Sequence, residues 1–384
     1  MIIDNYILVR YIGKGVFSEV FLSQMKGDNT KKFATKKLER SFIEKSEAIK
    51  YLKNEVLILK KLNHPNIVKI ESIKKTKKHF YIIMEFCNGG KLSDALEKYQ
   101  RKYEKPFSQE IVQHLMQQII DVFRYIHFQN IIHRNISSDN ILLNFGTEKD
   151  KEDLNMMKAT VKIIDFGFAC YIKSGLLYSI IGSPLNMDPL ILKKLVSDSQ
   201  KTKQLGYDQK ADVWSLGTIC YEMLIGRSAY DSESLDELVE KVERGIYTIP
   251  TDLSKETISF INGMMQYESN KRLTCEELSK HPFLINKVED FHQIDKLKCA
   301  DMWDHSYLRM IHKLKNSIWS IFNSENEIKL MSINGKDYNK NEENNNGLQL
   351  PKSGIPGNPI DQQIQNSGTD NITPSFGGGI FDDN

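Results

Sequence analysis

The chain has 384 residues, of which 40% are hydrophobic and 27% charged, and its 52 basic side chains nearly balance its 50 acidic ones. These proportions are ordinary for a globular protein, and the length suits one large domain, or two ordinary ones, with extensions. A formal net charge of only +2 gives no support to a bulk electrostatic partner, so we expect neither nucleic acid nor a membrane surface.

The five cysteines (Cys87, Cys170, Cys220, Cys275 and Cys299) are widely spaced and include no CxxC pair. This pattern predicts free thiols in a reducing compartment rather than a disulfide framework. No apolar run approaches the roughly 20 residues that span a bilayer, and the first ten residues lack a basic start and a cleavage site. We therefore expect no membrane span and a cytoplasmic location, with a nuclear one as the alternative.

The first hundred residues predict strands and one helix. Apolar side chains at Leu52, Val56 and Leu59 recur at helical spacing, which predicts a helix over 46–62 that ends before Pro65. The predicted strands form a small antiparallel sheet and cover residues 6–12, 20–23, 32–38, 67–73 and 80–85.

Helices dominate from residue 108 onward, with long amphipathic segments at 110–127, 211–224 and 254–265. A charged insert at 144–160 separates two short strands and carries no visible chemistry. Its sequence predicts only a connection.

Beyond Leu284 the character of the chain changes. Residues 285–330 predict a helical extension, in which 308–322 carries one apolar stripe that either packs back onto the main domain or docks onto a partner. Residues 331–384 are rich in Asn, Gly, Pro and Ser and predict a disordered tail, which could also hold a short docking motif.

Gly13 and Gly15 lie in the turn between the first two strands, within the sequence GKGVFSEV. Glycines let a hairpin backbone approach phosphates closely, since a Cβ atom would collide with them. Ser18 stands where a third glycine would complete the pattern. Taken alone, this turn is weak evidence for a phosphate-binding site.

Lys36 follows on the next strand, in the sequence Ala34-Thr35-Lys36, and Glu55 lies in the predicted helix. A lysine held against a phosphate needs a carboxylate to orient it. The order of glycine turn, Ala-x-Lys strand and helix glutamate therefore favours a nucleotide phosphate site.

Two later segments carry oxygen ligands. Asn140 ends the sequence HRNISSDN, which begins at His133, and Asp165 begins the sequence Asp-Phe-Gly. Their side-chain oxygens are of the hard type that Mg²⁺ prefers when it bridges nucleotide phosphates. We therefore predict Asn140 and Asp165 as metal ligands.

Together these ordered segments resemble the eukaryotic protein kinase family of the serine/threonine type, nearest the autophagy-initiating group, over nearly all of residues 4–284. The resemblance implies an α+β, bilobal protein-kinase-like fold. Residues 4–85 would form the small antiparallel sheet lobe with one helix, and 88–284 the larger, mainly helical lobe. It also implies ATP and Mg²⁺ as cofactors and a protein as partner or substrate.

The resemblance also implies roles for single residues. Lys36 would contact the α and β phosphates and pair with Glu55, and Asp212 would brace the catalytic loop. The nucleotide would be held by Ile12, Gly13, Gly15, Val20, Ala34, Lys36, Glu55, Met84, Glu85, Cys87 and Leu142. A stack of side chains joining the two lobes would consist of Leu59, Ile70, His133 and Phe166.

The catalytic loop departs from the family at two positions. Asn135 stands where the family has an aspartate that accepts the proton of the substrate hydroxyl, and losing one positioned base costs about 10²–10⁴ in rate. Ser137 replaces a lysine that steadies the γ-phosphate, and such a donor is often worth roughly 10²–10³. Asp139, four residues after Asn135, could supply partial negative charge near the substrate.

The activation segment departs as well. It ends in Asp188-Pro189-Leu190 where the family has Ala-Pro-Glu, and in the family that glutamate pairs with the arginine at Arg272. Because an unpartnered buried charge is costly, we predict that Asp188 takes over as the partner of Arg272.

Three functions stay open. The ATP and metal positions are kept while the phosphotransfer positions are lost, which favours a pseudokinase that binds Mg-ATP and regulates a partner. A slow serine/threonine kinase is the alternative, because positioning and Mg²⁺ dominate phosphoryl transfer. A third possibility is an empty pocket on a docking scaffold.

The segment 170–183 either carries a phosphate that Arg134 would bind or is an unmodified loop. Its candidate phosphorylation sites are Ser174, Tyr178, Ser179 and Ser183.

Overall fold

The structure is a computed structural model, and it describes residues 1–287 except 16–17, 46–47, 173–174, 198, 231 and 246. Residues 1–321 form one compact unit and 322–384 another, and the described residues all belong to the first. The predicted helix at 308–322 and the predicted tail lie outside the described residues, as does the extension beyond residue 287.

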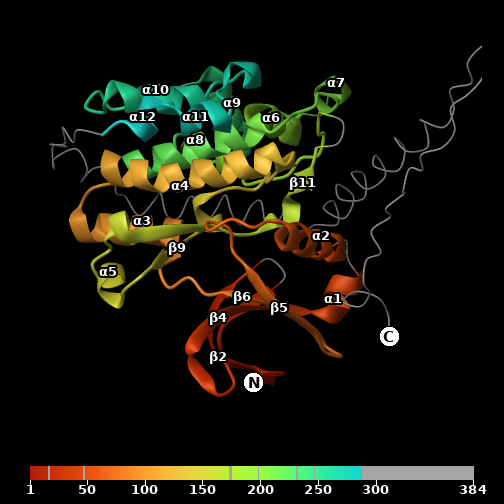
Figure 1. Cartoon of the computed structure of the whole chain (residues 1–384). Coiled ribbons are helices and arrows are strands. Elements are labelled where there is room, and N and C mark those ends of the chain that lie inside the picture. Colours follow the sequence, from red (N-terminus) through yellow and green to blue (C-terminus); the bar gives the residue numbers. More distant parts are fainter. Residues whose placement is uncertain are drawn as a thin grey trace, which may run out of the picture. The chain divides into compact units, whose positions relative to one another are not determined.

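The N-terminal part is a twisted six-stranded sheet with the strand order β1-β2-β3-β4-β6-β5, in which every neighbouring pair is antiparallel (Figure 1). The predicted antiparallel sheet is confirmed. The strands are β1 (Ile2–Ile3), β2 (Tyr6–Lys14), β3 (Ser18–Met25), β4 (Asp28–Glu39), β5 (Ile70–Lys75) and β6 (His79–Glu85).

Two details of this part differ from the prediction. The sheet begins at Ile2, because β1 pairs with β2 before the predicted start at residue 4. The predicted helix is α2 (Ala48–Lys61), but a second helix, α1 (Arg40–Lys45), precedes it. The expectation of one helix is therefore wrong, and the side chain of Ile43, which is 1% exposed, explains why α1 is held in place.

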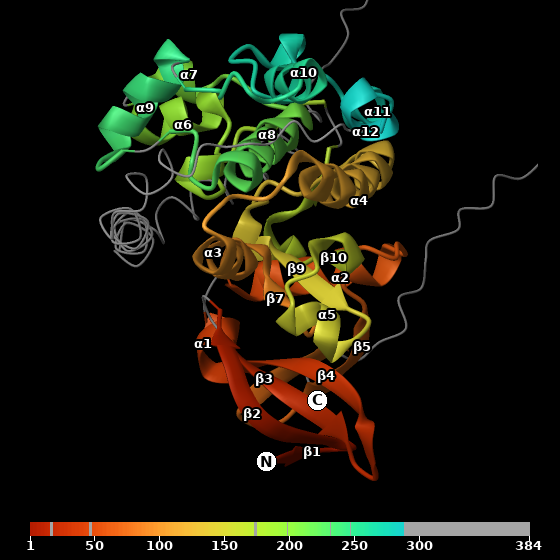
Figure 2. The ribbon, with the colours of Figure 1, turned by 90° about the vertical axis from the view of Figure 1, so that its left-hand side faces the viewer.

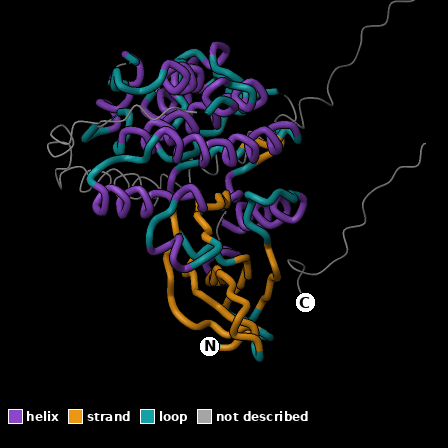
Figure 3. Tube along the Cα trace, turned by 60° about the vertical axis from the view of Figure 1, so that its left-hand side comes forward, coloured by secondary structure: helices purple, strands orange, loops and turns teal. Residues whose placement is uncertain are grey.

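The C-terminal part is mainly helical, as predicted, and Figures 2 and 3 show its helices gathered beyond the strands of the sheet. At its centre lies α8 (Lys210–Ile225), whose side chains are buried nearly all round. The other helices are α3 (Leu92–Tyr103), α4 (Gln109–Phe128), α5 (Glu148–Glu152), α6 (Pro189–Val196), α7 (Gln200–Lys203), α9 (Leu235–Arg244), α10 (Lys255–Met264), α11 (Cys275–Ser279) and α12 (Pro282–Ile285).

Short strands and 3-10 turns line the side of the helical part that carries the sequence motifs. Strand β9 (Ile141–Phe145) pairs with β10 (Ala159–Ile163) and with β7 (Gly90–Lys91), and β8 (Ile131–Ile132) pairs with β11 (Cys170–Tyr171). The 3-10 turns η1 (Ser138–Asn140), η3 (Phe166–Phe168) and η4 (Pro184–Asn186) follow them.

The charged insert at 144–160 is more ordered than predicted. The Thr147 hydroxyl accepts a hydrogen bond from the Asp150 amide and so caps α5, which is the preferred way to satisfy the first amides of a helix. A 3-10 turn, η2 (Met156–Lys158), then buries Met156.

No helix among the residues 1–287 that the structure describes is long and apolar enough to cross a membrane.

Candidate functional site

Lys36 on β4 and Glu55 on α2 form a closed ion pair. The Lys36 Nζ lies 2.9 Å from Glu55 Oε2 and 3.1 Å from Oε1, and the Glu55 side chain is 7% exposed. Burial by itself lowers the pKa of Lys36, but the carboxylates of Glu55 and Asp165 outweigh it and raise the pKa. The site therefore keeps a fixed positive charge next to the Asp165 carboxylate.

The register of the sheet places the predicted nucleotide-binding residues around this charge. Val20 lies opposite Lys36 and Gly13, and Ala34 lies opposite Met84. Directly paired residues in a sheet point to the same face, and so do residues two apart on one strand. The side chains of Val20, Ala34 and Lys36 therefore share one face.

The chain passes from β6 to the helical part through Glu85, the last residue of the strand, and Cys87. The Glu85 carboxylate accepts a hydrogen bond from the Lys69 amide at 2.8 Å and pairs with Lys162 of β10 at 2.7 Å. This pair, which the sequence analysis missed, ties the N-terminal sheet to the short sheet that carries Leu142. Burial raises the pKa of the Cys87 thiol to about 12, so the thiol stays neutral.

Asp165 lies at the start of η3 in the left-handed region, with φ 65° and ψ 66°. The Asn54 side chain on α2 donates hydrogen bonds to the backbone carbonyls of Gly167 at 3.1 Å and Ala169 at 2.6 Å. Helix α2 thus holds both Glu55 and the segment that carries Asp165. Sequence reasoning also missed Asn54, because a polar residue on a helix gives no sign of its distant partners.

The predicted stack between the two parts has its centre at Phe166, which is fully buried. The ring of Phe166 lies edge-on to His133 with centroids 4.8 Å apart. Leu59 belongs to the same apolar core, and Ile70 packs against it. Burial lowers the pKa of His133, which keeps this ring neutral beside Phe166.

Asp212 at the start of α8 braces the catalytic loop, as predicted. Its carboxylate accepts hydrogen bonds from the backbone amides of His133 and Arg134, both at 2.8 Å, and from His127 Nε2 at 2.9 Å. Arg134 has a positive φ of 67°, a conformation that costs free energy for a non-glycine residue. The two amide bonds to Asp212 hold the loop in that conformation.

The loop positions at which the chain departs from the family lie beside the metal candidates. Asn140 Nδ2 donates to the Asn135 backbone carbonyl at 2.7 Å, which joins the two positions. Ser137 directly precedes η1. The Asp139 carboxylate accepts a hydrogen bond from Ser93 at 2.7 Å and lies 3.5 Å from Lys91. Asp139 is therefore turned toward the start of α3 and already engaged there.

The activation segment touches the loop at Arg134. The guanidinium donates to the Ser179 hydroxyl at 2.6 Å and to the Phe168 carbonyl at 2.6 Å, and the Tyr207 hydroxyl donates to the Ser179 carbonyl. Among the four predicted phosphorylation candidates, Ser179 is thus bound to Arg134, while Ser174 lies outside the described residues.

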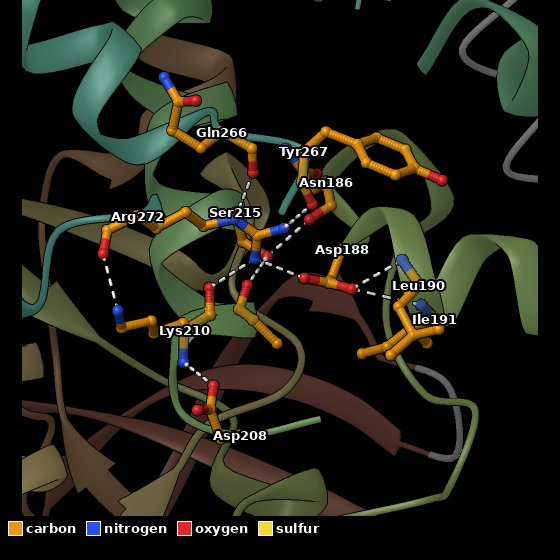
Figure 4. A network of polar contacts seen from close by, with 11 residues as sticks. Asn186, Asp188, Leu190, Ile191, Asp208, Lys210, Ser215, Gln266, Tyr267 and Arg272 are labelled. Carbon is orange, nitrogen blue, oxygen red and sulfur yellow. Dashed lines mark hydrogen bonds and ion pairs between the residues drawn. The ribbon is translucent and has the colours of Figure 1, made fainter. Parts of the chain in front are cut away.

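The predicted partner of Arg272 is confirmed. The Arg272 Nη1 lies 2.5 Å from Asp188 Oδ2, and both side chains are buried (Figure 4). The same guanidinium donates to backbone carbonyls of Lys210, Gln266 and Tyr267. The other Asp188 oxygen accepts from the Leu190 amide at 2.8 Å and caps α6, so one carboxylate serves two purposes.

Comparison with known proteins assigns this arrangement to a class. Residues 6–284 match the protein kinase domain family. The chain therefore belongs to the protein kinase family, and the expected fold and serine/threonine type are confirmed.

Two curated relatives show where the likeness lies. Serine/threonine-protein kinase ULK1 of Homo sapiens is 32% identical over 277 residues, which cover 71% of this chain and 24% of that protein. Calcium-dependent protein kinase 5 of Plasmodium falciparum (isolate 3D7) is 29% identical over 319 residues, which cover 77% of this chain and 51% of that protein. The chain thus spans about a quarter and about half of these relatives.

Proposed function

We propose that this protein kinase domain binds Mg-ATP but transfers phosphate very slowly or not at all, and acts as a nucleotide-gated regulator or scaffold for a protein partner. The observation that carries this proposal is an asymmetry within one site. The Lys36–Glu55 ion pair is closed at 2.9 Å beside Asp165, whereas the base position of the catalytic loop holds Asn135.

The proposal follows from the chemistry of the nucleotide-binding residues on one side of the site and of the catalytic-loop residues on the other. A partly exposed ammonium ion held by a buried carboxylate suits the α and β phosphates, and the oxygens of Asn140 and Asp165 suit Mg²⁺. An asparagine side chain is a hydrogen-bonding group without a charge, so it can orient a hydroxyl but cannot take its proton. Ser137 supplies no cation at the position that faces the γ-phosphate in the family.

Regulation by nucleotide requires that ATP prefer one conformation of the domain. Asn54 offers a physical link, because it joins α2 to the carbonyls of Gly167 and Ala169. A nucleotide whose Mg²⁺ is held by Asp165 would favour this docked position of α2. The partner would then bind according to the position of α2 and would not receive a phosphate.

A slow serine/threonine kinase is the second candidate. The position of α2, which keeps Glu55 paired with Lys36, favours this function. The closed Lys36–Glu55 pair and the braced loop at Asp212 form the arrangement that phosphoryl transfer requires. Because the transition state is loose, positioning and Mg²⁺ could sustain a low rate without a base. A domain with an empty pocket, used only as a docking surface, is disfavoured by the complete lysine and metal positions.

The test measures binding and transfer on the same purified full-length chain. Binding of Mg-ATP is measured by calorimetry, and transfer of labelled γ-phosphate is measured to the chain itself and to a generic acceptor protein. The control is Asp165→Asn, which removes a metal ligand. Binding with transfer no higher than in the control supports the proposal, and transfer above the control makes the slow kinase correct. Absence of Mg-ATP binding would contradict both.

A further inference from the structure

Ser18 occupies the third position of the glycine turn, where a glycine would complete the pattern. It lies on β3 opposite Leu38, two residues before Val20, which lies opposite Lys36. Side chains two residues apart on one strand point to the same face of the sheet. The Ser18 side chain therefore points to the face that carries the Lys36 ammonium ion.

The Ser18 hydroxyl is buried and unsatisfied. The residue is 7% exposed, and its Oγ has no hydrogen-bond partner among the residues that the structure describes. Within the described part of the chain, side-chain atoms of Tyr81, Gln109 and Ser232 share this property. Tyr81 lies opposite Lys37, on the other face of the sheet, and the remaining two belong to the helical part. Of these four atoms, only Ser18 Oγ lies on the Lys36 face, as far as the structure describes the chain.

The neighbouring glycine leaves room for this hydroxyl. The Gly15 amide donates to the Ser18 carbonyl at 2.7 Å, and a Cβ atom at Gly15 would lie only 2.5 Å from Ser18 Oγ. The hydroxyl therefore lies on the inner side of the turn, in the space that the missing side chain of Gly15 leaves.

We propose that the Ser18 hydroxyl donates a hydrogen bond to a phosphate oxygen of a bound nucleoside triphosphate. This inference rests on the proposed function, since it requires that the domain binds nucleotide. Hydrogen bonds to a charged acceptor are stronger than those between neutral groups, and an unsatisfied buried hydroxyl has none to give up. Lys36 supplies the charge that draws the phosphates to this face, and Ser18 adds a directed donor within the turn.

This role predicts opposite effects on the free and the bound protein. Replacing Ser18 by alanine removes a buried hydroxyl that has no partner in the free protein, so the melting temperature without ligand should stay the same or rise. The same change removes a bond to the phosphates, so the affinity for Mg-ATP should fall by about tenfold or more. The affinity for adenosine, which has no phosphate, should not change.

The experiment uses calorimetry and thermal unfolding on the full chain with Mg-ATP and with adenosine as probes. The variants are Ser18→Ala and Ser18→Gly, and the latter restores the third glycine. The matched control is Ser23→Ala, on the same strand and the opposite face, where the hydroxyl bonds to Thr35. The control should bind Mg-ATP as the natural chain does, at temperatures where it is folded.

Each outcome decides the inference. A tenfold loss of Mg-ATP affinity in both Ser18 variants, with unchanged adenosine affinity, supports it. An unchanged Mg-ATP affinity overturns it and leaves the proposed function standing. An equal loss for adenosine overturns it as well, because Ser18 would then shape the turn rather than contact phosphate. If the natural chain binds adenosine but not Mg-ATP, the proposed function fails together with the inference.

Discussion

Asp188 Oδ2 and Arg272 Nη1 lie 2.5 Å apart between side chains that are 3% and 1% exposed. The guanidinium carbon also lies 5.1 Å from the centroid of the Trp214 ring, and three backbone carbonyls accept further hydrogen bonds from the guanidinium. This arrangement joins the end of the activation segment to the centre of the helical part. The family uses a glutamate at another position for the same purpose, so the chain has kept the interaction while changing the residue.

We predict that Asp188→Asn lowers the free energy of unfolding by about 3–5 kcal/mol, because it leaves the buried Arg272 charge without a counter-ion. Asparagine also caps helices well, so the loss reports the ion pair rather than the cap of α6. Urea unfolding followed by circular dichroism measures the change.

The matched control is the surface pair between Lys193 and Glu243, whose side chains are 45% and 39% exposed. Glu243→Gln should cost less than about 1 kcal/mol, since exposed pairs contribute little. Similar losses in the two variants would show that burial of the Asp188–Arg272 pair does not matter.

The pH dependence of stability should carry the signature of His127. Burial lowers its pKa, but the side chains of Cys275 and Asp212 raise the pKa to about 10. Since this value lies above the ordinary one of about 6.5, the charged imidazole stabilises the fold. That contribution is complete below about pH 6.5 and is lost as the pH rises towards 10.

The measurement compares the free energy of unfolding of the natural chain and of His127→Gln at pH 6, 7.5 and 9. The difference between the two proteins should shrink as the pH rises. A difference that stays constant over this range would mean that the pKa of His127 is the same in the folded and the unfolded chain, which would contradict the prediction.

Asn54→Leu should loosen the contact between α2 and the segment that begins at Asp165. The substitution leaves the Gly167 and Ala169 carbonyls without their donor, and each unsatisfied buried group costs about 1–3 kcal/mol. We expect faster hydrogen exchange in 165–170 and in α2, measured by mass spectrometry. Asn29→Leu, at an exposed position near the start of β4, is the control. Equal exchange in the two variants would contradict the role of Asn54 as a link.

Much of the site could be predicted from the sequence because its motifs are local. Lys36, Asn140 and Asp165 each lie in a short segment whose residue types already suit phosphates or Mg²⁺. The Asp188–Arg272 pair is more distant in sequence, yet it was predictable because a buried charge demands a partner and few acids were candidates.

The missed features depend on tertiary contacts. Helix α1 has only six residues, too few to be stable alone, and forms because Ile43 is buried. Strand β1 has two residues and exists only as a pair with β2. The Glu85–Lys162 pair joins residues 77 apart in the sequence, and the bond from Asn54 to Ala169 joins residues 115 apart. No local sequence pattern predicts such contacts.

The most direct test of the account compares phosphate transfer from Mg-ATP by the natural chain, by Asn135→Asp and by the double variant Asn135→Asp with Ser137→Lys. Transfer is compared at saturating Mg-ATP for each protein, because the position of Ser137 faces the γ-phosphate in the family and a lysine there would change the affinity. We predict that the natural chain stays at the background of Asp165→Asn and that restoring the base and the cation raises turnover by at least about 10²-fold. Turnover in the natural chain equal to that of the double variant would contradict the claim that Asn135 and Ser137 limit catalysis.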